Sequence, residues 1–272
     1  MTVQRPRLIA TDLDHTLLTS DGRVSPRTRT ALDAARTAGI HVVPVTARQP
    51  IGLREVAAGA AFEDWALCGN GSFGIHLTRG DLLFAQEIPA VVQRELVDAL
   101  TAALPGVLFA SVREAGERFV AQDGYAALAQ LSDHKRDPRT MGGVPLSDVV
   151  AEPSLKIVVR HPEVPLDEVF GTLQGLGLRG FEATMSGAPF VEVMAEGVTK
   201  ASGLAQLCAH LGVDRAEVVA FGDGLNDLEM LQWAGHGVAV ANAIEPLRDA
   251  ADEIAPSNDD DGVAATIERL LG

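Results

Sequence analysis

Four aspartates in two short segments carry the strongest chemical signal in the sequence. Asp12 and Asp14 stand two residues apart after an apolar run, and Asp223 and Asp227 follow another apolar run near the other end of the chain. The carboxyl ends of parallel strands form the crevice in which open α/β sheets bind ligands. Four carboxylates gathered there would require a cation, and an all-oxygen ligand set favours Mg²⁺. A single aspartate at a strand end is more often a helix cap, but two such pairs favour a metal site.

Two further residues suit phosphate chemistry. Thr46 ends the apolar run 42–45, where its hydroxyl and the next backbone N–H could hold a phosphate oxygen at a helix N-terminus, although threonine is also a common helix cap. Lys200 opens a predicted helix in a chain that has 19 arginines and only three lysines. A lysine retained in such a chain suits a site that needs a compact charge, although a lone lysine is more often solvated.

The composition limits the classes of function. The chain has 272 residues, of which 47% are hydrophobic and 22% charged, and this excludes an intrinsically disordered protein. Its net charge of -15 argues against nucleic acid or an anionic membrane as partner. Cys68 and Cys208 have no metal-ligand spacing, and no apolar stretch is long enough to span a bilayer. We therefore expect a cytoplasmic, monomeric protein that binds a small molecule.

Both ends of the sequence alternate strand and helix patterns. A helix start at Ser25-Pro26 and a stop at Gly39 separate the first apolar run from a second one. Strand, helix, strand, helix, strand is the order typical of a parallel sheet. The predicted strands cover residues 8–10, 40–45, 65–68, 218–221 and 237–240, and the predicted helices include 200–211 and 225–233.

The middle of the chain has a different pattern. Paired strands and separate helices favour an α+β insertion at residues 81–189, placed within an α/β core made of residues 1–80 and 190–272. The segment 133–145 is rich in charge, proline and glycine, so we expect an exposed loop there. The predicted strands of the insertion are 107–112, 118–121 and 155–160, and its predicted helices are 89–104 and 166–175.

These residues together resemble the haloacid dehalogenase (HAD) superfamily. Its four motifs are similar, in order, to Asp12-Leu13-Asp14-His15-Thr16-Leu17-Leu18, Val45-Thr46-Ala47-Arg48, Lys200 and Gly222-Asp223-Gly224-Leu225-Asn226-Asp227. The long insertion before Lys200 resembles the C2-capped branch (subfamily IIB) that contains the Cof-type phosphatases. Gly69-Asn70-Gly71 and Ser257-Asn258 are also similar to that branch.

The resemblance implies an Mg²⁺-dependent phosphatase with a Rossmann-like core and an inserted cap that selects the substrate. It implies that Asp12 attacks phosphorus to form an aspartyl-phosphate, and that Asp14 protonates the leaving oxygen and then activates water. The implied metal ligands are Asp12, the backbone carbonyl of Asp14, Asp223 and, in a supporting role, Asp227. The implied phosphate-binding residues are Leu13, Thr46, Ala47, Lys200 and Asn226.

One residue departs from the family pattern, and several functions remain open. His15 stands where the family usually has glycine, and histidine tolerates a positive φ better than most residues. We expect a phosphatase for small phosphorylated metabolites such as sugar phosphates. A phosphomutase on the same core, or a phosphometabolite-binding protein with weak catalysis, are the alternatives. Asp14 disfavours a dehalogenase, which needs no acid for its leaving group.

Overall fold

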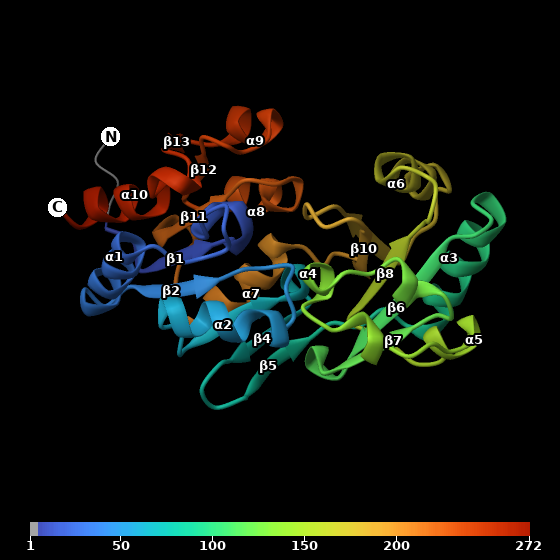
Figure 1. Cartoon of the computed structure of the whole chain (residues 1–272). Helices are drawn as coiled ribbons and strands as arrows, with labels where there is room; N and C mark the ends of the chain where they lie inside the picture. Colours follow the sequence, from blue (N-terminus) through green and yellow to red (C-terminus); the bar gives the residue numbers. More distant parts are fainter. Residues whose placement is uncertain (1–4) are drawn as a thin grey trace. The chain divides into compact units, whose positions relative to one another are not determined.

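The computed structural model describes residues 5–272, apart from the side chain of Glu55, and forms two compact units (Figure 1). The first, which we call the core unit, contains the described residues up to Ala47 together with Leu53–Phe84 and Thr199–Gly272. The second, the insertion unit, contains Arg48–Gly52 and Ala85–Val198. Among residues 5–272, no helix has the length and apolar character needed to cross a membrane.

A five-stranded parallel sheet forms the centre of the core unit. Its order is β13 (Glu253–Ala255), β12 (His236–Val240), β11 (Val218–Gly222), β1 (Leu8–Thr11) and β2 (His41–Pro44). Every residue of β1 is buried, as expected for a strand with parallel neighbours on both sides. Thr11, the last residue of β1, pairs with Phe221 in β11 and with Pro44 in β2. The segments that follow these three strands therefore leave the same edge of the sheet.

Helices cover this sheet. α1 (Pro26–Thr37) packs against α10 (Gly262–Leu271), whereas α7 (Lys200–Leu211) packs against α8 (Leu228–Trp233), which also contacts α9 (Glu245–Ala250). The predicted start of α1 is confirmed, because the Ser25 side chain accepts a hydrogen bond from the Thr28 N–H and Pro26 is the first helical residue. α2 (Pro50–Ala60) begins in the insertion unit and continues into the core unit.

The third predicted strand is present as β3 (Trp65–Cys68), but its expected place in the parallel sheet is wrong. β3 pairs antiparallel with β4 (Phe73–His76), and β5 (Leu82–Ala85) completes a separate three-stranded sheet. One parallel bridge, between Val45 and Leu67, connects β3 to the segment after β2. A tight turn after β3 reverses the chain and gives β3 an antiparallel partner next in sequence.

The insertion unit contains an antiparallel sheet of five strands. Its order is β7 (Arg118–Ala121), β6 (Leu108–Arg113), β8 (Lys156–Arg160), β10 (Val191–Ala195) and β9 (Phe181–Thr184). Because β10 pairs with β8 and β9, this unit extends beyond the expected end at residue 189. Its helices are α3 (Ala90–Ala103), α4 (Leu131–His134), α5 (Leu146–Val149) and α6 (Leu166–Gly175).

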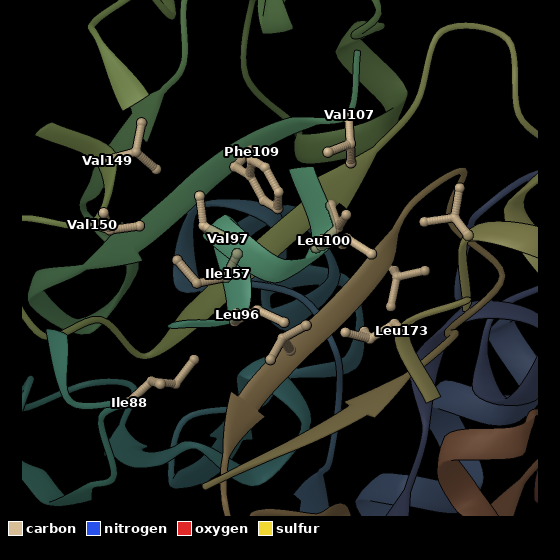
Figure 2. Packing of buried hydrophobic residues seen from close by; sticks show 14 residues of the cluster. Ile88, Leu96, Val97, Leu100, Val107, Phe109, Val149, Val150, Ile157 and Leu173 are labelled. Carbon is tan, nitrogen blue, oxygen red and sulfur yellow. The ribbon is translucent and has the colours of Figure 1, made fainter. Parts of the chain in front are cut away.

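One face of this sheet carries the main apolar cluster of the insertion unit. Ile157 of β8 packs there with Leu96 of α3 and Leu173 of α6, as Figure 2 shows from close by. Val159 of β8 belongs to the same cluster. Alternate residues of a strand point to opposite faces, so Val158 belongs to a second cluster with Tyr125 and other buried residues.

Segment 131–143 covers part of this second cluster. The His134 ring stacks on Phe190 with a centroid distance of 4.6 Å, and its Nε2 is 2.9 Å from the Tyr125 hydroxyl. Burial lowers the pKa of His134 to about 4. The expectation of an exposed loop from residue 133 is therefore wrong at its start, because these ring contacts hold α4 against the unit.

We predict that His134 makes the insertion unit sensitive to acid. The pKa of this imidazole falls from 6.5 to about 4 on folding, so the unfolded chain binds the proton more readily between these pH values. The stabilisation is complete above pH 6.5 and is lost as the pH falls toward 4, by up to about 3 kcal/mol. Urea unfolding followed by the signal of Tyr125, the only tyrosine, measures this loss.

His134→Gln keeps a polar partner for Tyr125 but removes the titrating ring, so it should flatten the pH dependence of unfolding. His161→Gln, in the same unit but outside the ring cluster, should preserve that dependence. Equal pH dependence in wild type and His134→Gln would contradict the prediction.

Candidate active site

The ends of three parallel strands place the predicted site residues together. The Asp12 N–H donates to the Phe221 carbonyl at 3.0 Å, so the chain stays paired with β11 one residue beyond β1. On the other side, the Val45 N–H donates to the Thr11 carbonyl at 2.8 Å. Asp12, Thr46 and Asp223 therefore all lie at the carboxyl edge, where open α/β sheets bind ligands.

A buried ammonium joins three distant parts of the chain. Lys200 is 1% exposed, and its Nζ donates to Oδ1 of Asp12 and to Oδ1 of Asp227, at 2.6 Å in each case. Thr199 caps α7 by accepting a hydrogen bond from the Ser202 N–H, which fixes Lys200 as the first helical residue. Burial alone would lower the pKa of Lys200, but the charges and hydrogen bonds of both aspartates outweigh burial and raise it. The ammonium is therefore charged at neutral pH.

The loop after β11 is held by its own aspartate. Oδ2 of Asp227 accepts hydrogen bonds from the N–H groups of Asp223 and Gly224, both at 3.0 Å. Gly222 is required at this close approach, because a Cβ there would lie 2.4 Å from the Cβ of Asp227. The Thr16 hydroxyl donates to Oδ1 of Asp223 at 2.8 Å and so ties this loop to the segment after β1.

The segment after β1 turns sharply at His15. Asp14 has an extended backbone, with φ −70° and ψ 124°, whereas His15 has a φ of 61°. The positive φ considered for this position is thus present, and the Asn242 side chain supports it by donating to the His15 carbonyl at 2.8 Å. Asp14 is half-buried and His15 is exposed.

The predicted phosphate-binding residues lie around the same edge, with one difference. Thr46 is buried, but α2 begins only at Pro50, so the helix N-terminus expected directly after Thr46 is absent. Leu13 is fully buried, which leaves its backbone as the group that could meet a ligand. Ala47 is half-buried, and Asn226 is half-buried in the loop after β11.

Three of these carboxylates could hold a metal ion. One oxygen from each of Asp12, Asp223 and Asp227 lies within 4.8 Å of the others. Burial raises the pKa of Asp12 well above its usual value, and burial together with the charge of Asp227 raises the pKa of Asp223. A cation would relieve this cost, and an all-oxygen set suits Mg²⁺. Among the described residues, the carboxylate of Asp14 lies outside this group.

Comparison with known proteins places the chain in a family. Residues 9–267 match the model of the haloacid dehalogenase-like hydrolases. The chain belongs to this HAD hydrolase family, and it is a phosphatase of the Cof type.

Several members of the family match over nearly their whole length. The pyridoxal phosphate phosphatase YbhA of Escherichia coli is 28% identical over 267 residues, which cover 96% of this chain and 97% of that protein. The 5-amino-6-(5-phospho-D-ribitylamino)uracil phosphatase YcsE of Bacillus subtilis is 28% identical, with complete coverage of both chains. The crystal structure of a haloacid dehalogenase-like hydrolase from Bacteroides thetaiotaomicron is 28% identical, with a TM-score of 0.77 and coverage of 97% and 99%.

The candidate site also contains residues to which the sequence analysis gave no role. Thr16 binds Asp223, Asn70 binds Asn226, and Asn242 supports the turn at His15. Thr16 and Asn70 stand inside segments that resemble the family. Their position in these segments is the feature of the sequence that could have indicated a role. Asn242 stands outside every such segment, and only the folded chain brings it to His15.

We predict that Lys200→Met destabilises the core unit through its buried carboxylates. The substitution keeps the length of the side chain but leaves Asp12 and Asp227 without their ammonium. Loss of one partner of a buried ion pair typically costs about 3–5 kcal/mol. Urea unfolding at pH 7 without divalent cations measures the loss. Added Mg²⁺ should recover part of it, because a divalent ion can neutralise the same oxygens.

Lys156→Met provides a matched control. Lys156 is also buried and pairs with the buried Glu192, but in the insertion unit. This variant should lose stability that Mg²⁺ does not restore. A Lys200→Met protein as stable as wild type, with or without Mg²⁺, would contradict the assigned charge balance.

Proposed function

We propose that this HAD phosphatase hydrolyses small phosphorylated metabolites with Mg²⁺ and carries the phosphoryl group transiently on Asp12. The observation that supports this most is the contact of Lys200 with Oδ1 of Asp12. Because Lys200 holds Oδ1, we assign Oδ2 as the atom that attacks phosphorus. The ammonium favours the ionised, nucleophilic form of a carboxylate whose pKa is raised by burial.

Asp14 is suited to act as the general acid and then as the general base. In the first step, Oδ2 of Asp12 forms a bond to phosphorus, the bond to the leaving oxygen breaks, and Asp14 gives that oxygen its proton. In the second step, Asp14 takes a proton from water, whose oxygen attacks phosphorus and releases Asp12 and orthophosphate. Asp14 lies outside the set of three carboxylates that could hold a metal ion, and it is half-buried. Both observations support this role.

The remaining site residues would neutralise and orient the phosphoryl group. When bound, Mg²⁺ supplies positive charge to the phosphoryl oxygens. Asp12, the Asp14 carbonyl and Asp223 would hold the ion, and Asp227 would support it through Lys200. The groups that would bind the phosphoryl oxygens are Lys200, the Thr46 hydroxyl, the Asn226 amide and the backbone N–H groups of Leu13 and Ala47.

The insertion unit would act as the cap that selects the leaving group. Every residue proposed to handle phosphate or metal belongs to the core unit, so chemistry and selectivity are divided along the chain. The named relatives act on pyridoxal phosphate and on a phosphoribityl compound, both small phosphomonoesters. We propose substrates of the same size class, with sugar phosphates among them. The net charge of -15 supports a small-molecule substrate rather than nucleic acid or a membrane surface.

We predict that turnover requires Mg²⁺. Without a cation, Asp12 and Asp223 repel both each other and an anionic substrate. Chelator should abolish release of orthophosphate from p-nitrophenyl phosphate or from a panel of phosphorylated metabolites, and excess Mg²⁺ should restore it. Full activity in chelator would refute the metal assignment. Formation of an isomeric phosphate ester in place of orthophosphate would identify a phosphomutase.

We predict that Asp12→Asn and Asp14→Asn fail at different steps. Asp12→Asn removes the nucleophile, so no acid-stable labelled phosphoenzyme should form. Asp14→Asn loses general acid and base assistance, each worth about 10²–10⁴ in rate. p-Nitrophenolate leaves without much protonation, so phosphorylation of Asp14→Asn by p-nitrophenyl phosphate should stay faster than its dephosphorylation, and phosphoenzyme should accumulate. Rapid-quench measurement tests this, and normal turnover by Asp12→Asn would show that the roles are assigned wrongly.

A further inference from the structure

The turn Gly69-Asn70-Gly71 after β3 has no part in the mechanism proposed above. Asn70 is 1% exposed and has φ 58° and ψ 34°, in the left-handed region that few residues adopt. A buried amide must also find hydrogen-bond partners inside the protein. Two hydrogen-bond partners of Asn70, Thr46 and Asn226, come from separate segments of the candidate active site.

The backbone of Asn70 holds Thr46. The Asn70 N–H donates to the Thr46 carbonyl at 2.9 Å, and the Thr46 N–H donates to the Leu67 carbonyl at 2.9 Å. Both peptide groups of Thr46 are thereby fixed by β3 and the turn that follows it. This fixes the backbone from which the Thr46 hydroxyl projects.

The side chain of Asn70 holds Asn226. Nδ2 of Asn226 donates to Oδ1 of Asn70 at 3.0 Å. This bond sets the orientation of the Asn226 amide, so that its nitrogen lies toward the turn. Because an amide nitrogen carries two hydrogens, Asn226 has a second N–H with a defined direction.

The turn itself is packed closely against the start of α7. Gly71 has a φ of 88°, and a Cβ there would lie 2.3 Å from the carbonyl oxygen of Thr199. A Cβ on Gly203 would lie 2.8 Å from the Cα of Gly71. Two glycines thus allow backbone to meet backbone beside Lys200. The turn therefore has a fixed position relative to the segments that carry Thr46, Asn226 and Lys200.

We propose that Asn70 is a positioning residue for phosphoryl binding, which sets the Asn226 amide at a fixed distance from Thr46. The proposal rests on the function proposed above, in which Thr46 and Asn226 bind phosphoryl oxygens. Asn70 does not touch the phosphoryl group and acts through Asn226. Its asparagine identity meets two needs, a tolerated positive φ and a side-chain acceptor.

The kinetic test uses Asn70→Gly, which tolerates the same φ but removes the acceptor. We expect kcat/KM for p-nitrophenyl phosphate to fall about 10- to 100-fold, and the inhibition constant of orthophosphate to rise. Asn226→Ala should cause a loss of similar size, and Asn70→Gly added to Asn226→Ala should cause little more, because both remove one interaction. If the fold-losses in kcat/KM of the two single variants multiplied in the double variant, the proposal would be overturned.

Asn258→Ala is the matched control. Asn258 is also buried, but its side-chain amide donates to the Leu18 carbonyl at 2.9 Å and its backbone N–H donates to Oδ1 of Asn242 at 3.0 Å. Its effect on kcat/KM, whatever its size, should multiply with that of Asn226→Ala. If Asn258→Ala were coupled to Asn226→Ala as strongly as Asn70→Gly is, a general loosening of the fold would explain the result. That outcome would overturn the proposal.

A second measurement separates this proposal from the proposed function. The side-chain amide resonances of Asn226, assigned by their loss in Asn226→Ala, should shift in Asn70→Gly and stay in place in Asn258→Ala. Unchanged resonances in Asn70→Gly would overturn the positioning role, even in an active phosphatase. A wild-type protein that releases no orthophosphate from any phosphomonoester would instead refute the proposed function, and the resonances would still decide whether Asn70 holds Asn226.

Discussion

The core unit depends on one buried ammonium shared by two carboxylates. Removing Lys200 and its partners from water is costly, and each partner is stabilised only while the others stay in place. Asp12, Lys200 and Asp227 come from the first strand end, the start of α7 and the loop after β11. Their contacts therefore constrain three elements at once. A strand register or helix start shifted by one residue would leave a charge buried without a partner.

The same group of charges indicates which kind of ion the site would bind. Three carboxylates and one ammonium carry a formal charge of −2, which a single divalent cation would balance. Burial raises the pKa values of Asp12 and Asp223, because removal from water disfavours the ionised form of each carboxylate. A divalent cation would stabilise the ionised form of both carboxylates, and it would make the edge of the sheet receptive to an anionic substrate.

Sequence patterns could predict the parts of the fold that local chemistry determines. The apolar run 8–10 and the cap at Ser25 predict β1 and α1 without knowledge of their neighbours. The antiparallel partner of β3 could not be predicted, because it depends on the left-handed Asn70 in a turn that reverses the chain. The pairing of β10 with β8 could not be predicted either, because the sequence of a buried strand such as 191–195 does not indicate which sheet the strand joins. The shielding of His134 depends on Tyr125 and Phe190, whose ring contacts are not local in sequence.

The carboxylates of Asp12, Asp223 and Asp227 differ in how many of their oxygens accept hydrogen bonds. Both oxygens of Asp227 are engaged, Oδ1 by Lys200 and Oδ2 by two backbone N–H groups of its own loop. Asp12 and Asp223 each have one oxygen engaged by a side chain, Lys200 and Thr16 respectively. Asp227 is thus fixed in place as an anchor for the loop and the ammonium, whereas Asp12 and Asp223 keep one oxygen each for a ligand. This difference supports a direct metal contact from the free oxygen of Asp223, attack on phosphorus by the free Oδ2 of Asp12, and an indirect role for Asp227. Three aspartates that look alike in the sequence thus differ in the hydrogen bonds around them, and these differences support the separate roles proposed for them.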